Sequence, residues 1–200
     1  MPAAPWRPVT ELLDPAGRAW RARTAAVREA LGGAVEERVA FSTAHLGVVA
    51  RVLAPAFALA VTSSAVPSAD IWWQPVLGGM VPLSFAASVT RVPAAGLLDA
   101  FTDSVVPLVV GMTSAAATTC PIAPAILWDN SASALNSSVT MLGPAYADRA
   151  VPFANALLRR APWGIPAPDV GDGFRRGSCC LIYRVSPGPP RPVCGDCVLG

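Results

Sequence analysis

Four of the five cysteines in this 200-residue chain lie between positions 179 and 197. Cys179 and Cys180 are adjacent, whereas Cys194 and Cys197 are separated by two residues, and thirteen residues lie between the pairs. Because both pairs belong to one short segment, four thiolates can meet there without help from the rest of the fold. We therefore expect this segment to fold around a metal centre and to carry the function.

Three kinds of sulfur site are compatible with four clustered cysteines: structural zinc, disulfides and an iron-sulfur centre. A zinc site usually takes two thiolates from each of two C-x2-C pairs, but the first pair here is adjacent. Neighbouring side chains in an extended chain point in opposite directions, so an adjacent pair suits two metals or an irregular loop around a cluster. Gly177 and Ser178 make the required turn accessible.

Disulfides require an oxidising compartment, and residues 1–7 lack the apolar core of a secretory signal. We therefore expect a cytoplasmic protein, in which clustered thiols more often bind metal. Peripheral association with the inner membrane stays an open alternative. The Arg-, Ala- and Pro-rich composition is typical of a GC-rich bacterial genome.

Residues 175–184 (RRGSCCLIYR) and 194–199 (CGDCVL) resemble the C-terminal signature of the FhuF-like ferric siderophore reductases. A second, weaker similarity links residues 126–135 (ILWDNSASAL) to a Trp-x-Asn segment in the larger domain of that family. The resemblance implies a [2Fe-2S] cluster with the following ligands: Cys179, Cys180, Cys194 and Cys197. The gap between the pairs is longer than the family usually shows, and we expect its proline-rich residues 187–192 to bulge away from the cluster.

The function that this resemblance implies is reduction of Fe(III) in ferric siderophores to Fe(II). One electron would pass from the cluster to the chelate, and Fe(II) binds hard oxygen donors less strongly, so the iron is released. No catalytic residue beyond the cluster is required, and the electron comes from an external donor. Two alternatives remain: an iron-sulfur electron-transfer or iron-handling partner protein, and a binding module with a structural four-cysteine zinc site.

Several polar and aromatic residues are candidates for tuning the cluster or docking the substrate. Cationic groups beside a cluster stabilise the negative charge gained on reduction, although exposed arginines can equally be solvated surface residues. The two residues from the weaker similarity could contact the cluster lobe, or could be a core Trp and a capping Asn. The candidates are Arg175, Arg176, Tyr183, Arg184, Trp128 and Asn130.

Composition limits the remaining possibilities. The chain is 53% hydrophobic and 14% charged, and its 15 basic residues are all arginines scattered along the sequence. No basic run interleaved with aromatics is present, so no nucleic acid partner is expected. Residues 104–128 are uncharged, but their prolines and hydroxyl side chains favour buried core helices over a membrane span.

The predicted fold is mainly α (α+β), with a short β-hairpin and a small C-terminal cysteine-rich lobe. Helices are expected from Asp14-Pro15 to Gly32-Gly33 and over 35–61, kinked or split at Pro55. A hairpin of 71–73 and 81–85 turns at Gly78-Gly79. Three more helical segments follow: 94–116, 121–142 and 144–160.

The linker 162–168 cannot sustain a helix. It divides the chain into a helical substrate-docking domain, 1–168, and a [2Fe-2S]-binding lobe, 169–200. Two other residues receive structural interpretations: His45, the single histidine, as a core residue, and Cys120 as a buried thiol that behaves as a small hydrophobe.

Overall fold

The computed structural model describes residues 5–68, 70–76, 80–85, 88–166, 168–171, 173–186, 188 and 191–199. This part of the chain is mainly helical, which confirms the predicted fold class. The helices are α1 (Arg18–Ala30), α2 (Glu37–Ser63), α3 (Leu97–Ser104), α4 (Val106–Thr119), α5 (Pro124–Leu142) and α6 (Ala147–Arg159). Four short 3-10 turns accompany them: η1 (Val9–Leu13), η2 (Ala94–Gly96), η3 (Pro144–Tyr146) and η4 (Ile182–Arg184).

Two small antiparallel sheets complete the described fold. Strands β1 (Arg7–Pro8), β3 (Ile71–Trp73) and β4 (Leu83–Phe85) form one sheet in the order β1-β3-β4, and β2 (Ala65–Pro67) pairs with β5 (Val89–Arg91) in the other. The predicted hairpin is confirmed, with Ile71 opposite Phe85. Its predicted turn at Gly78 and Gly79 lies outside the described residues.

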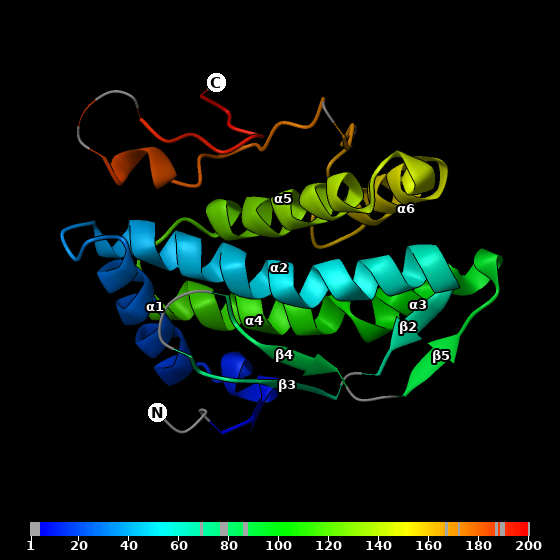
Figure 1. The fold of residues 1–200 in the computed structure, drawn as a ribbon, viewed down its shortest axis with the longest axis horizontal. Coiled ribbons are helices and arrows are strands. Elements are labelled where there is room, and N and C mark those ends of the chain that lie inside the picture. The colour runs from blue at the N-terminus through cyan, green and yellow to red at the C-terminus, as the bar shows by residue number, and fades with distance from the viewer. Residues whose placement is uncertain are drawn as a thin grey trace.

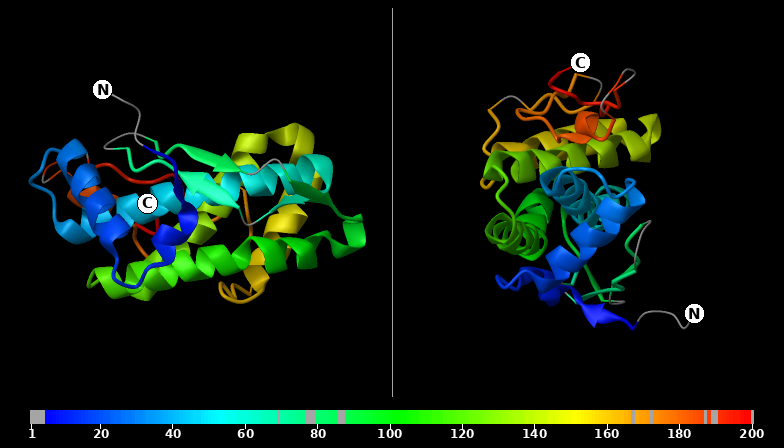
Figure 2. Two further views of the ribbon diagram at one scale, coloured as in Figure 1. Left: turned by 90° about the horizontal axis from the view of Figure 1, so that it is seen from below. Right: turned by 90° about the vertical axis from the view of Figure 1, so that its left-hand side faces the viewer.

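The elements are stacked so that the cysteine segment and the sheets lie on opposite faces. Figure 1 shows the C-terminal segment running over α5, with α2 and α4 beneath α5 and the strands β3 and β4 on the far side. The end-on view in Figure 2 shows the same order of layers, with the two termini at opposite faces. The helical layers therefore separate the cysteines from the sheets.

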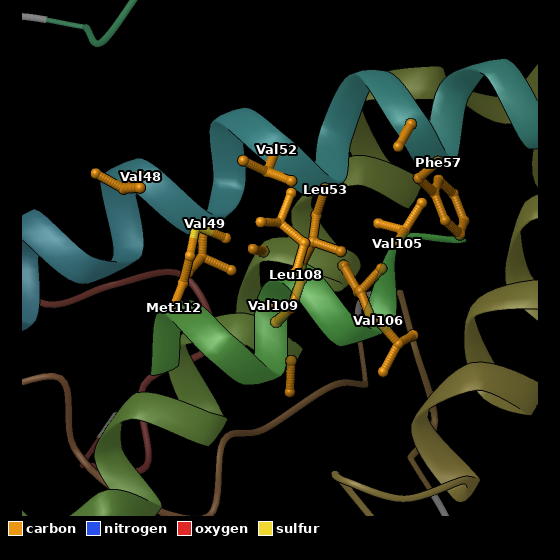
Figure 3. Close-up of a cluster of buried hydrophobic side chains, with 14 of the residues drawn as sticks. Val48, Val49, Val52, Leu53, Phe57, Val105, Val106, Leu108, Val109 and Met112 are labelled. Atoms are coloured by element: carbon orange, nitrogen blue, oxygen red, sulfur yellow. The ribbon is translucent and has the colours of Figure 1, made fainter. Parts of the chain in front are cut away.

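Helix α2 is the centre of the packing, because it contacts α1, α4 and α5. Figure 3 shows the valines of α2, together with Leu53 and Phe57, facing apolar side chains of α4 and of Val105, which precedes α4. Burial of one such side chain contributes about 1.5–3 kcal/mol to folding. The residues labelled in this cluster are Val48, Val49, Val52, Leu53, Phe57, Val105, Val106, Leu108, Val109 and Met112.

Two helical stretches are long and apolar enough to cross a membrane by length and composition alone. They are Glu37–Ser63 and Ala94–Thr119, with mean hydropathies of 1.8 and 1.4. Of the most apolar window in each, 56% and 33% respectively is buried inside the protein. Core helices of soluble proteins pass the same test, so the result does not by itself place either helix in a membrane.

Three helix boundaries differ from the sequence prediction. Asp14 does not cap α1: its carboxylate accepts the Ala16 N–H in a local turn, and the helix begins after Gly17, whose φ is +65°. Helix α2 continues through Pro55, since tertiary packing on both sides compensates for the lost backbone hydrogen bond. The predicted helix over 94–116 breaks at Val105, just before Pro107, which lacks an N–H.

His45 and Cys120 both lie in the hydrophobic interior. The His45 imidazole stacks on Trp20 with ring centroids 5.6 Å apart, and its Nε2 lies 3.3 Å from Thr113 Oγ1. Burial lowers the pKa of His45 from 6.5 to about 3, so the ring stays neutral in the folded protein.

This buried histidine predicts a loss of stability in acid. Below pH 6.5 the unfolded chain is protonated at His45, whereas the ring in the folded chain stays neutral until the pH approaches 3. The free energy of unfolding therefore falls as the pH decreases from 6.5 towards 3. The loss between pH 8 and pH 5 is about 2 kcal/mol. Urea unfolding at both pH values should show His45→Gln with a pH dependence smaller by that amount. An unchanged pH dependence in the variant would contradict the buried neutral imidazole.

Candidate metal centre

The four C-terminal cysteines gather where the last segment of the chain crosses α5. Cys180 and Cys194, one from each pair, have sulfur atoms 3.6 Å apart. Cys180 and Cys197 are buried, and Cys179 and Cys194 are partly exposed. All four are free thiols. The segment therefore brings both pairs together, as the spacing predicts.

Backbone N–H groups point at two of the sulfur atoms. Leu181 has a left-handed backbone with φ of 70°, and its N–H donates to Cys179 Sγ over 3.3 Å. The Leu199 N–H donates to Cys197 Sγ at the same distance. Such bonds stabilise thiolates and help to set the potential of a bound cluster. The left-handed residue directly follows Cys180 and precedes the turn η4 (Ile182–Arg184).

The separation of the Cys180 and Cys194 sulfur atoms fits shared coordination of a metal ion. A disulfide would need about 2.05 Å between sulfur atoms, far below the 3.6 Å observed. Two thiolates on one tetrahedral ion, each about 2.3 Å from it, lie about 3.7 Å apart. The described residues contain no group of three or more metal-binding side chains around one point. The observed separation therefore fits two thiolates on one metal ion, as in a zinc site or at one iron of a two-iron centre.

Without metal, two of these thiols, Cys179 and Cys194, hold their protons at neutral pH. Burial, followed by the neighbouring Cys180 and Asp196, raises the pKa of Cys194 to about 12. Burial also raises the pKa of Cys179, while the Leu181 N–H and the Arg176 guanidinium oppose that shift. Loading with metal must therefore displace protons from the site.

Arg176 supplies a buried positive charge beside the cysteines. Its side chain is 2% exposed, donates to Asn130 Oδ1 through Nη2 and to the Ser178 carbonyl through Nε. Its Nη1 is buried and has no partner among the described residues. A buried cation without a carboxylate partner is costly unless negative charge lies nearby. The anionic cluster and its thiolates would supply that charge, so the surroundings fit the group.

Helix α5 and helix α2 hold the cysteine segment in place. Asn130 is fully buried and donates to the Ser42 carbonyl of α2 over 3.0 Å while accepting from Arg176. Next to Asn130 in α5, Asp129 accepts a hydrogen bond from the Ser178 hydroxyl through Oδ2. Asp129 and Asn130 are thus hydrogen-bonded to Ser178 and Arg176, in the segment that directly precedes Cys179.

An apolar cavity of about 160 Å³ lies between α2 and two of the cysteines. Its walls include Leu46 of α2, Ile182, and the thiols Cys180 and Cys194. The mostly apolar lining lowers the local polarity beside these two sulfur atoms, which strengthens electrostatic interactions there.

Residues 176–199 match the family model of the FhuF 2Fe-2S C-terminal domain. The match contains all four cysteines and confirms both the resemblance and the 2Fe-2S cofactor predicted from the sequence. Residues 1–175 lie outside the matched range. No curated protein and no solved structure matches the chain.

The remaining candidate residues around the matched segment have different surroundings. Arg184 is exposed and pairs with Glu36 at the start of α2, 3.0 Å apart. Trp128 packs against the hydrophobic core, and Tyr183 is half-buried on η4. Arg175 is exposed and donates to the Phe174 carbonyl. Of the six candidates, Arg176 and Asn130 are the two in the buried network; Asp129 and Ser178 join it without having been predicted.

The division at residue 168 stays a prediction, although Val170 and Phe174 beyond it belong to the main hydrophobic core.

A larger pocket of about 360 Å³ lies on the other side of the molecule from the matched C-terminal segment, between α1 and β3. Charged groups on its wall pair with each other, Arg7 with Glu11 and Arg18 with Asp14. Its lining residues all lie before position 77, so this pocket does not adjoin the C-terminal cysteines.

Proposed function

We propose that the protein reduces the Fe(III) of ferric siderophores to Fe(II) by one-electron transfer. The observation that carries the proposal is the match of residues 176–199 to the FhuF 2Fe-2S domain. Figure 1 shows the C-terminal segment, which carries the four cysteines, lying over α5. Fe(III) binds hard oxygen donors more tightly than Fe(II), so a single electron weakens the grip of the chelate. The products are the Fe(II) chelate, from which iron leaves, and the oxidised protein.

The chain contributes binding, charge and shielding to this reaction. Cys179, Cys180, Cys194 and Cys197 would hold the cluster, which supplies one electron at a time when bound. Arg176 places a positive charge where negative charge would accumulate, and the mostly apolar cavity beside α2 lowers the polarity around Cys180 and Cys194. No side chain forms or breaks a covalent bond with the substrate. The electron is replaced by a separate reduced donor, which completes the cycle.

We place the reaction in the cytoplasm, on the side of the inner membrane where imported chelates arrive. Clustered free thiols are maintained in such a reducing compartment, which supports this location. Fractionation of cells under iron limitation would show whether the protein is free or peripherally attached to the membrane.

Reduction of a ferric siderophore by anaerobically purified protein, followed with a ferrous trap, tests the proposal. With a chemical reductant that has sufficient driving force but reduces the chelate only slowly by itself, the wild type should form the ferrous complex over many turnovers. An electron-transfer partner protein would carry the same visible spectrum without turnover of the chelate. A zinc module would show neither spectrum nor turnover.

A further inference from the structure

We propose that the groove between α5 and the turn from Cys194 to Cys197 is the docking site of the ferric chelate, and that it favours chelates of net negative charge. This inference rests on the proposed function and assigns its substrate site. The groove has a volume of about 510 Å³ and adjoins the cysteine turn directly.

Helix α5 forms one wall of the groove. Thr140 and Met141 follow Ser137 by three and four residues, so all three project towards one side of the helix. All three are exposed, and Met141 retains 79% of its accessible surface. Two hydroxyl groups beside one large apolar side chain can receive a ligand with both polar and apolar surface.

The opposite wall brings the ligand next to the cluster-binding thiols. Gly195 and Asp196 line the groove, and they are the two residues between Cys194 and Cys197. Gly195 is exposed, and a Cβ added there would meet no atom within 4 Å. A chelate can therefore rest against the backbone that joins two ligands of the cluster, which gives the proximity that electron transfer requires.

The accessible charge in this groove is positive. Arg175 lines it with an exposed guanidinium, whose bond to the Phe174 carbonyl uses one of five N–H groups. The other charged residue in the lining, Asp196, is only 8% exposed and faces Cys194. The exposed donors on both walls suit the oxygen atoms at the periphery of a ferric chelate, and Arg175 favours those with negative charge.

Filling the groove tests the site. Gly195→Phe and Thr140→Phe each place an aromatic ring in the groove, one from each wall. Gly188→Phe is the control, because Gly188 lies in the cysteine lobe but not in the groove lining, and a Cβ added there meets no atom within 4 Å. Ferric citrate and ferric desferrioxamine serve as the anionic and cationic probes. We expect both groove variants to retain the wild-type visible spectrum and iron content but to reduce both chelates at least about tenfold more slowly, with Gly188→Phe unchanged.

Charge at position 175 tests the preference. Arg175→Glu should raise the KM for ferric citrate about tenfold with little change in kcat, and leave or lower the KM for ferric desferrioxamine. If Gly195→Phe fails to load iron, Thr140→Phe alone decides the site. Loaded groove variants that match the wild type would overturn the docking site while the proposed function stands. A loaded wild type that reduces neither probe would overturn the proposed function itself.

Discussion

Replacing Cys194 with serine is expected to give a colourless protein without acid-labile sulfide, even when it is purified without oxygen and with iron supplied. Cys194 lies 3.6 Å from Cys180, so its loss opens the closest sulfur pair in the site. A serine hydroxyl is a much harder ligand and seldom replaces a thiolate on iron. We expect the visible absorbance to fall below about a tenth of the wild-type value.

Cys120 provides the matched control for this substitution. It is buried in the hydrophobic core at the C-terminal end of α4 and is not part of the C-terminal segment that carries the other four cysteines. Cys120→Ser removes one thiol from the chain and should keep the full spectrum and sulfide content. Equal loss of colour in both variants would mean that the C-terminal sulfur atoms are not specific ligands of the cluster.

Removing the charge of Arg176 is expected to lower the reduction potential of the cluster. The reduced cluster carries one more negative charge, which a nearby guanidinium stabilises. A unit charge within about 10 Å, at an effective dielectric constant of about 20, contributes roughly 1.7 kcal/mol, or about 70 mV for one electron. Arg176→Gln should show a decrease of that order in a spectroscopic redox titration.

Two further variants separate charge from hydrogen bonding at this position. Arg176→Lys keeps the charge but cannot reproduce the contacts to Asn130 and Ser178, so its potential should stay near that of the wild type while the protein loses stability. Arg184→Gln removes an exposed charge that pairs with Glu36 and should change the potential little. Equal potentials for Arg176→Gln and Arg176→Lys would contradict the electrostatic role.

The sulfur site could be predicted from the sequence because its ligands are close in the chain. The spacing of Cys179, Cys180, Cys194 and Cys197 and the residues around them carry the whole signal, and the family match covers the same segment. The left-handed turn directly after Cys180 was harder to predict. It is made by Leu181 in a left-handed conformation, which a leucine seldom adopts.

The surroundings of the site depend on contacts between distant residues and could be predicted only in part. Arg176 and Arg184 both flank the cysteines, and the sequence does not distinguish them. In the structure Arg176 is buried against α5, whereas Arg184 is exposed and pairs with Glu36. Asn130 was a candidate, whereas its neighbour Asp129 was not, because nothing local indicates that it meets Ser178. The same reasoning explains Pro55, which tertiary packing accommodates within α2.

The most direct test of a two-iron centre on these thiols is chemical analysis of the wild-type protein, combined with paramagnetic resonance. Protein purified without oxygen should contain about two irons and two acid-labile sulfides per chain, and one-electron reduction should produce a signal from a single unpaired electron. Zinc in place of iron, or iron without inorganic sulfide, would contradict the account.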